Sequence, residues 1–126
     1  MDSLGRRDIL YNHFPDLGGR RKPHLESRNN AWRNDAFRGY ADHMESAEFR
    51  AGIERLWEVA VVTGPTAIMC AEAVWWRCHR GLISDYLKVG GVEVIHIIGA
   101  GKIERHPWTS AARVEDGTLS YRGSSL

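Results

Sequence analysis

The sequence predicts one α/β domain over residues 1–126, a small three-layer structure with a mostly parallel sheet. Two apolar runs, at 66–70 and 92–98, have the composition of strands, and the segment 72–88 between them has helical periodicity. A strand, a helix and a strand in this order form a βαβ crossover over 66–98, which implies a parallel pair and a right-handed connection. Asp116–Gly117 between two short alternating runs also predicts a C-terminal hairpin.

Shorter elements are expected before and around this crossover. Residues 9–14 are predicted to be a strand that ends at Pro15. Asn34 and Ser46 each precede apolar residues at helical spacing and can cap two helices, because their side-chain oxygens accept hydrogen bonds from the first-turn N–H groups. Gly64–Pro65 should end the second helix, and Gly90–Gly91 should end the crossover helix.

The crossover helix has polar side chains on its apolar face. At about 100° per residue, Glu72 and His79 fall two turns apart among the apolar residues, whereas Ser84 and Asp85 fall on the opposite, solvent side. A buried carboxylate needs a partner or takes up a proton. Glu72 and His79 therefore form either a structural pair that fixes the helix against the sheet, or an acid–base pair in a site.

Other candidate site residues lie at the expected strand ends. Cys70 ends the first strand just before the helix N–H groups, which favour a thiolate, although a buried cysteine is usually inert. His106 follows the second strand on the same rim and either reaches the site or lies in solvent. Ligands collect at this rim in parallel sheets, so we expect the site there.

The segment Asp16–Lys22 predicts an anion-binding loop. Gly18 and Gly19 allow a turn with exposed N–H groups, and Arg20 and Arg21 follow at once. The alternative is a solvated turn. The loop lacks the Gly-Lys-Ser/Thr ending of a Walker loop.

Composition excludes several classes of protein. The chain has 126 residues, 43% of them hydrophobic, and a net charge of +1, which fits one ordinary domain and argues against general coating of nucleic acid. No apolar run approaches the roughly 18 residues needed to cross a bilayer, and no hydrophobic signal core is visible, so we expect no membrane contact and a cytoplasmic location.

Three functions are open. The first is an enzyme or binder of a phosphorylated or other anionic small molecule, with a nucleotide as one example. Here Glu72 and His79 are acid and base, Cys70 is a nucleophile or hydrogen-bond donor, and the anion is held by Gly18, Gly19, Arg20, Arg21 and Arg80. Whether it is an enzyme stays open, and no cofactor is identified.

The second function is a nucleic-acid-binding module that uses the N-terminal arginine cluster, with Trp32 stacking on a base. The third is a metal-stabilised structural domain with Cys70, Cys78 and His79 as ligands. Their spacing is not that of a zinc finger, so no metal site is predicted.

The pattern Cys-x-Glu-x5-Cys-His-Arg at residues 70–80 resembles the motif of an uncharacterised bacterial family called domain of unknown function 488. The segments 15–21, 37–41 and 94–97 also resemble this family, and together they cover nearly the whole chain. The resemblance implies an α/β fold with a mostly parallel sheet and no established activity. Because family members usually begin with further strands, this shortened chain is expected to have an uncovered sheet edge and to form a homo-oligomer.

Overall fold

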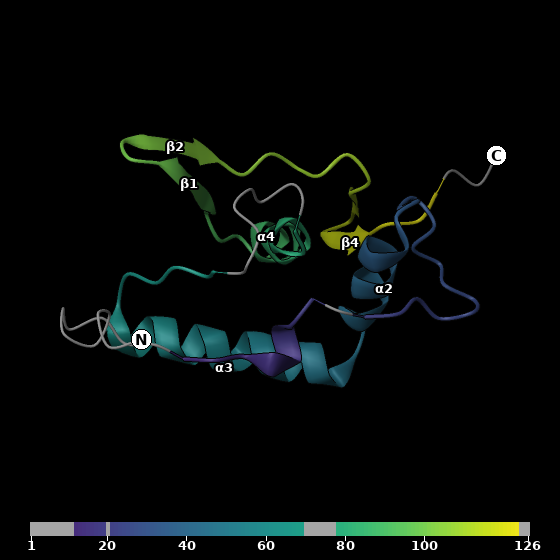
Figure 1. Cartoon of the computed structure of the whole chain (residues 1–126), viewed down its shortest axis with the longest axis horizontal. Coiled ribbons are helices and arrows are strands. Elements are labelled where there is room, and N and C mark those ends of the chain that lie inside the picture. Colours follow the sequence, from purple (N-terminus) through teal and green to yellow (C-terminus); the bar gives the residue numbers. More distant parts are fainter. Residues whose placement is uncertain (1–11, 20, 70–77, 124–126) are drawn as a thin grey trace.

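The computed structural model describes residues 12–19, 21–69 and 78–123. In chain order the elements are the short 3-10 helix η1 (Pro15–Leu17), the helices α2 (Asp35–His43), α3 (Ala47–Thr63) and α4 (Arg80–Val89), and the strands β1 (Ile95–Gly99), β2 (Lys102–Arg105), β3 (Arg113–Glu115) and β4 (Thr118–Ser120). Figure 1 shows α3 along one side of the molecule, the β1–β2 hairpin on the other side, and α4 between them.

The predicted parallel sheet, with its βαβ crossover at 66–98, is wrong. β1 pairs antiparallel with β2, β3 pairs antiparallel with β4, and these are two separate two-stranded sheets. Residues 12–14 and 66–69 form no strand. The physical reason is local: the turn after Gly99 brings β2 directly back onto β1, so the backbone groups of β1 find partners a few residues away instead of across a helix.

The helix boundaries predicted from capping residues are confirmed. Asn34 accepts hydrogen bonds from backbone N–H groups of the first turn of α2, and Ser46 does the same for α3. The chain leaves α3 at Gly64 and α4 at Gly90, as the glycine signals indicated. These boundaries depend on neighbouring residues only, which is why the sequence was sufficient to find them.

The predicted C-terminal hairpin is also confirmed. β3 and β4 pair in register around Asp116 and Gly117, whose φ angles are 52° and 76°. Positive φ at both central residues is the geometry of a type I′ turn, and Asp-Gly is among its preferred sequences.

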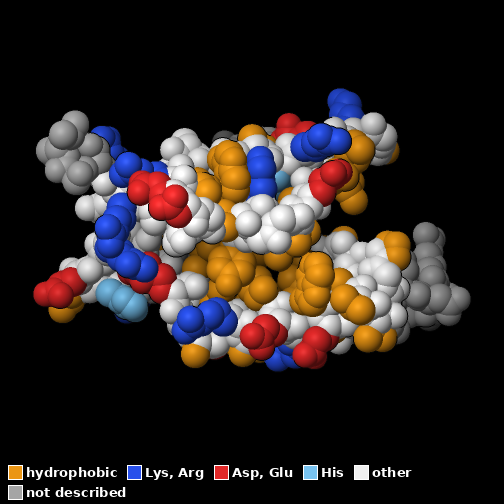
Figure 2. Space-filling model, turned by 180° about the vertical axis from the view of Figure 1, so that it is seen from behind, with side chains coloured by type: hydrophobic (Ala, Val, Ile, Leu, Met, Phe, Trp, Pro, Cys, Tyr) orange, Lys and Arg blue, Asp and Glu red, His pale blue; other side chains and the backbone are white. Residues whose placement is uncertain are grey.

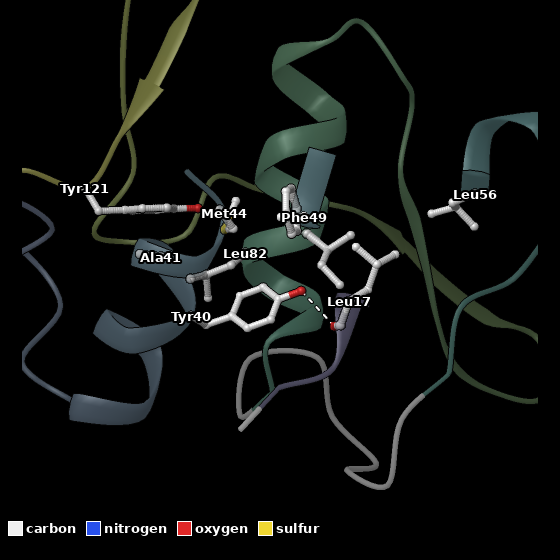
Figure 3. Close-up of a cluster of buried hydrophobic side chains, with 9 residues drawn as sticks. Leu17, Tyr40, Ala41, Met44, Phe49, Leu56, Leu82 and Tyr121 are labelled. Atoms are coloured by element: carbon white, nitrogen blue, oxygen red, sulfur yellow. Dashed lines mark hydrogen bonds between the residues drawn. The ribbon is translucent and has the colours of Figure 1, made fainter. Parts of the chain in front are cut away.

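A small apolar core joins η1, α2, α3 and α4. Tyr40 and Phe49 are fully buried in it, and the Tyr40 hydroxyl donates a hydrogen bond of 2.8 Å to the carbonyl oxygen of Leu17 (Figure 3). The other buried members are Leu17, Ala41, Met44, Leu56, Leu82, Ile83 and Tyr121. Because Leu17 is buried in this core and its carbonyl oxygen accepts the bond from Tyr40, the loop after η1 is fixed close to the start of α4.

The solvent face predicted for α4 is wrong at Ser84 and Asp85, which are both buried. The helix is covered on two sides, because the apolar core lies on one side and the chain from β2 to Tyr121 covers another. That second segment supplies polar partners for Asp85, namely His106, Thr109 and Tyr121. Helical periodicity separates an apolar from a polar face and assigns the polar face to solvent. It therefore does not predict that the polar side chains of Ser84 and Asp85 are buried.

Candidate functional site

The loop after η1 contacts the residues that precede α4. Gly19 lies directly against the imidazole of His79: a Cβ atom at position 19 would lie 2.4 Å from His79 Nδ1. The ring of Tyr40 lies on the same imidazole, with centroids 4.9 Å apart. The structure therefore brings together two of the predicted segments, the glycine loop and the Cys-His-Arg sequence, and it holds His79 between Gly19 and Tyr40.

Arg21 shapes this loop through its guanidinium group. Its Nε donates to the carbonyl of Gly18 (3.2 Å), its Nη2 to the carbonyl of Pro15 (3.0 Å), and its Nη1 to the carboxylate of Glu48 (3.3 Å). The N–H group of Gly18 is also used, because it donates to the Pro15 carbonyl (3.0 Å). The turn is thus held by hydrogen bonds within the loop and to Glu48, and the role of Arg21 in the described structure is structural.

Cys78 and Arg80 are linked at the start of α4. The Cys78 sulfur accepts hydrogen bonds from the backbone N–H group of Arg80 (3.3 Å) and from its side-chain Nε (3.4 Å). Cys78 is buried, and the hydrogen bond from Arg80 Nε to its sulfur restrains the Arg80 side chain.

His79 is disposed to be a neutral base. Burial, followed by the positive charge of Arg80, holds the pKa of His79 below its ordinary value of 6.5. At neutral pH the imidazole is therefore uncharged and carries a lone pair beside a fixed cation. Such a pair can bind an anion through the cation and move a proton through the imidazole.

Several predicted site residues lie outside the described part of the chain: Cys70, Glu72 and Arg20. The placement of His79 inside a helix that starts at 72 is wrong, because α4 begins only at Arg80 and His79 is its N-cap residue. The expected meeting of Glu72 with His79 stays a prediction, since Glu72 is outside the described residues. Of the residues proposed for nucleic acid, Trp32 packs against Phe37 and Tyr121, with ring centroids 5.0 and 5.8 Å away.

A second polar cluster, which the sequence analysis missed, centres on Asp85. The carboxylate and the His106 side chain are both 0% exposed, and His106 Nε2 lies 2.7 Å from Asp85 Oδ1. Thr109 donates to both carboxylate oxygens, from its backbone N–H (3.1 Å) and its hydroxyl (2.5 Å). The Tyr121 hydroxyl donates to Oδ2 at 2.7 Å. All these bonds fully satisfy the buried carboxylate.

His96 extends this cluster to the surface of the protein. Its Nε2 lies 2.7 Å from His106 Nδ1, so Asp85, His106 and His96 form one hydrogen-bonded row. Burial, followed by the charge of His106, lowers the pKa of His96 to about 4. One sequence signal pointed here: His96 interrupts the most apolar strand of the chain, between Ile95 and Ile97.

An apolar groove separates α3 from α4 and β1. It encloses about 500 Å³, and Figure 2 shows it as a hollow lined with hydrophobic side chains across the back of the molecule. Its polar lining residues include Arg80, Ser84 and His96. Arg80 lies close enough to lower the pKa of both His79 and His96, so its charge acts on the groove and on the loop site together.

Within the described ranges, no three His, Cys, Asp or Glu side chains are grouped so that they could hold a metal ion. Cys70, one of the three proposed metal ligands, is outside those ranges. In the same part of the chain, no helix has the length and apolar character that crossing a membrane requires.

Comparison with known protein families shows to which family the chain belongs. A family model described as "Domain of unknown function DUF488" matches residues 2–87. The chain belongs to this family. The part matched to DUF488 includes the glycine loop, α2, α3 and most of α4, whereas His96 and His106 lie beyond it. Searches of curated proteins and of solved structures found no significant match.

The lowered pKa of His96 predicts an acid-sensitive fold. Between pH 6.5 and about 4, the unfolded chain binds a proton at this position and the folded chain does not, so stability falls as pH is lowered through this range. In His96→Gln this contribution is absent. We therefore expect the stability difference between wild type and variant, measured by urea unfolding, to shrink from about pH 7 to about pH 4.5.

The control for this measurement is His13→Gln, because His13 is exposed. Its stability difference from wild type should stay constant over the same range. A constant difference for His96→Gln as well would contradict the assigned pKa shift.

Proposed function

We propose that this DUF488 protein binds a phosphorylated or otherwise anionic small molecule, such as a nucleotide, between the glycine loop and the start of α4. The observation that carries the proposal is the neutral His79 imidazole held between Gly19 and Tyr40, with Arg80 beside it. Arg80 supplies the positive charge, and its restraint by Cys78 reduces the entropy lost when an anion binds.

The first turn of α4 adds to this attraction, because the partial positive charge of a helix N-terminus favours anions. In this proposal His79 acts as the acid or base, and Cys70, Glu72 and Arg20 complete the site as the sequence predicts. Gly19 is needed because any larger residue displaces His79.

The test is equilibrium dialysis with inorganic phosphate and a mononucleotide. Arg80→Gln removes a charged hydrogen-bond donor, and a loss of about 1.5–3 kcal/mol corresponds to binding weaker by about ten- to a hundred-fold. Gly19→Ala should weaken binding as well, because the added methyl group moves the His79 ring.

Arg50→Gln is the matched control, because Arg50 is exposed on α3 and is remote in sequence from the loop and from α4. It should bind like wild type. Equal affinity of Arg80→Gln and Arg50→Gln would contradict the proposed site. Nucleic-acid binding, a homo-oligomer and a cytoplasmic location remain predictions from the sequence.

A further inference from the structure

An aromatic pocket lies beside the first turn of α4, and the proposed loop site does not use it. Trp32, Phe37 and Trp108 line this pocket, and Thr109 and Ser110 bring hydroxyl groups to it. The rings of Trp32 and Phe37 pack edge to face, with centroids 5.0 Å apart. Trp108 is 39% exposed, so part of it is accessible to an incoming molecule. Aromatic walls with a few polar groups suit the binding of a flat ring with polar edges.

The volume of the aromatic pocket is that of one ring. It encloses about 180 Å³. An apolar cavity of about 150 Å³ can bind benzene, whereas sites for whole small molecules enclose roughly 300–1,000 Å³. The pocket is therefore large enough for one six-membered ring and too small for a complete nucleotide. The remainder of such a ligand would lie outside it.

The indole N–H group of Trp32 favours a ligand that carries a hydrogen-bond acceptor. Trp32 Nε1 is shielded from solvent, and it has no hydrogen-bond partner within the described part of the chain. An indole N–H can only donate, and a buried donor without an acceptor is unfavourable. A ring carbonyl in the pocket can supply this acceptor once the indole turns toward it.

The buried Asp85 cluster holds two walls of the aromatic pocket in place. Thr109 donates to the Asp85 carboxylate from its backbone N–H (3.1 Å) and its hydroxyl (2.5 Å), which fixes the chain next to Trp108. The Tyr121 hydroxyl donates to the same carboxylate (2.7 Å), and the Tyr121 ring packs against Trp32. Because both walls are fixed by hydrogen bonds within the protein, little ordering of the pocket is needed when a ligand binds.

Cys78 connects the aromatic pocket to the proposed anion site. Its side chain lines the pocket, and its sulfur accepts the hydrogen bond from Arg80 Nε (3.4 Å). His79, whose imidazole contacts the glycine loop, is the next residue in the chain. The aromatic pocket and the loop site therefore lie at the same end of α4.

We propose that the aromatic pocket binds the base of a pyrimidine nucleotide, with the base stacked on Trp108 and a ring carbonyl accepting the Trp32 N–H. This inference rests on the proposed function in one respect, the binding of the phosphate at the loop site, and it names the substrate class. A pyrimidine base meets both requirements of the pocket, because it is a single flat ring and carries a carbonyl oxygen. Every base can stack on an aromatic side chain, so the small volume selects the pyrimidine over the larger purine.

The test is equilibrium dialysis of the full chain with uridine, which has the base and lacks the phosphate. We expect saturable binding, and weaker binding of adenosine. Trp108→Ala should weaken uridine binding by about five- to 150-fold, the usual effect of removing an aromatic side chain on which a base stacks. Trp32→Phe keeps a ring and removes the N–H donor, so we expect binding weaker by about two- to ten-fold. Urea unfolding verifies that both variants fold.

Trp57→Ala is the matched control, because Trp57 is also an exposed tryptophan and lines the groove beside α3 instead of the aromatic pocket. It should bind uridine like wild type. Absence of uridine binding, wild-type affinity in Trp108→Ala or Trp32→Phe, or tighter binding of adenosine would overturn the inference, even if phosphate still binds in an Arg80-dependent way. Trp108-dependent binding of uridine without any binding of inorganic phosphate would support the aromatic pocket and count against the loop site alone.

Discussion

Replacing Asp85 with alanine is expected to lower the free energy of unfolding by about 3–5 kcal/mol, the usual effect of removing one partner from a buried charged pair. The variant leaves His106, Thr109 and Tyr121 with buried donors that have lost their acceptor. Since a domain is typically stable by only about 5–15 kcal/mol, this loss should be plain in urea unfolding monitored by tryptophan fluorescence.

Tyr121→Phe provides the matched comparison for Asp85→Ala. It removes one hydrogen bond to the carboxylate and keeps the aromatic ring in the core, so we expect a loss of only about 1.5 kcal/mol. If Asp85→Ala were no more destabilising than Tyr121→Phe, the carboxylate would not be the centre of this cluster.

Gly39→Ala is expected to destabilise the protein by about 3 kcal/mol, at the upper end of the usual cost of overpacking. The added Cβ atom would lie 2.1 Å from the carbonyl oxygen of Arg21 and 2.8 Å from the carbonyl carbon of Lys22. These are backbone atoms, which cannot rotate away as a side chain can. The loop segment must therefore separate from α2.

The sign of the stability change in Gly39→Ala distinguishes the effect of packing from that of helix propensity. In an exposed helix interior, alanine is more favourable than glycine by about 1 kcal/mol, so propensity alone predicts that Gly39→Ala stabilises α2. The measurement is again urea unfolding. Gly99→Ala is the control, because nothing lies within 4 Å of the position of its added Cβ, and its change should stay within about 0.5 kcal/mol. A stabilised Gly39→Ala would show that the loop does not pack on α2.

Gly39→Ala is also expected to affect the proposed binding site. Gly39 sets the distance between α2 and the chain at Arg21, and Arg21 in turn shapes the turn that brings Gly19 onto His79. The displaced loop in the variant should therefore bind phosphate less tightly than wild type.

Features that depend on neighbouring residues could be predicted without a structure. The caps at Asn34 and Ser46, the ends at Gly64 and Gly90, and the Asp116–Gly117 hairpin are confirmed, because the side chain or φ angle that produces each of them acts within a few residues. The family membership was likewise visible in the pattern of residues 70–80 and is confirmed over 2–87.

Contacts between residues far apart in the chain could not be predicted in this way. A strand pattern at 92–98 does not name its partner, and the partner proved to be the local β2 instead of a parallel strand across the helix. In the same way, the helical period placed Asp85 toward solvent, because no periodicity records that a later segment will bring His106, Thr109 and Tyr121 over it. A buried carboxylate is stable only with such partners, and residues far away in the chain supply them.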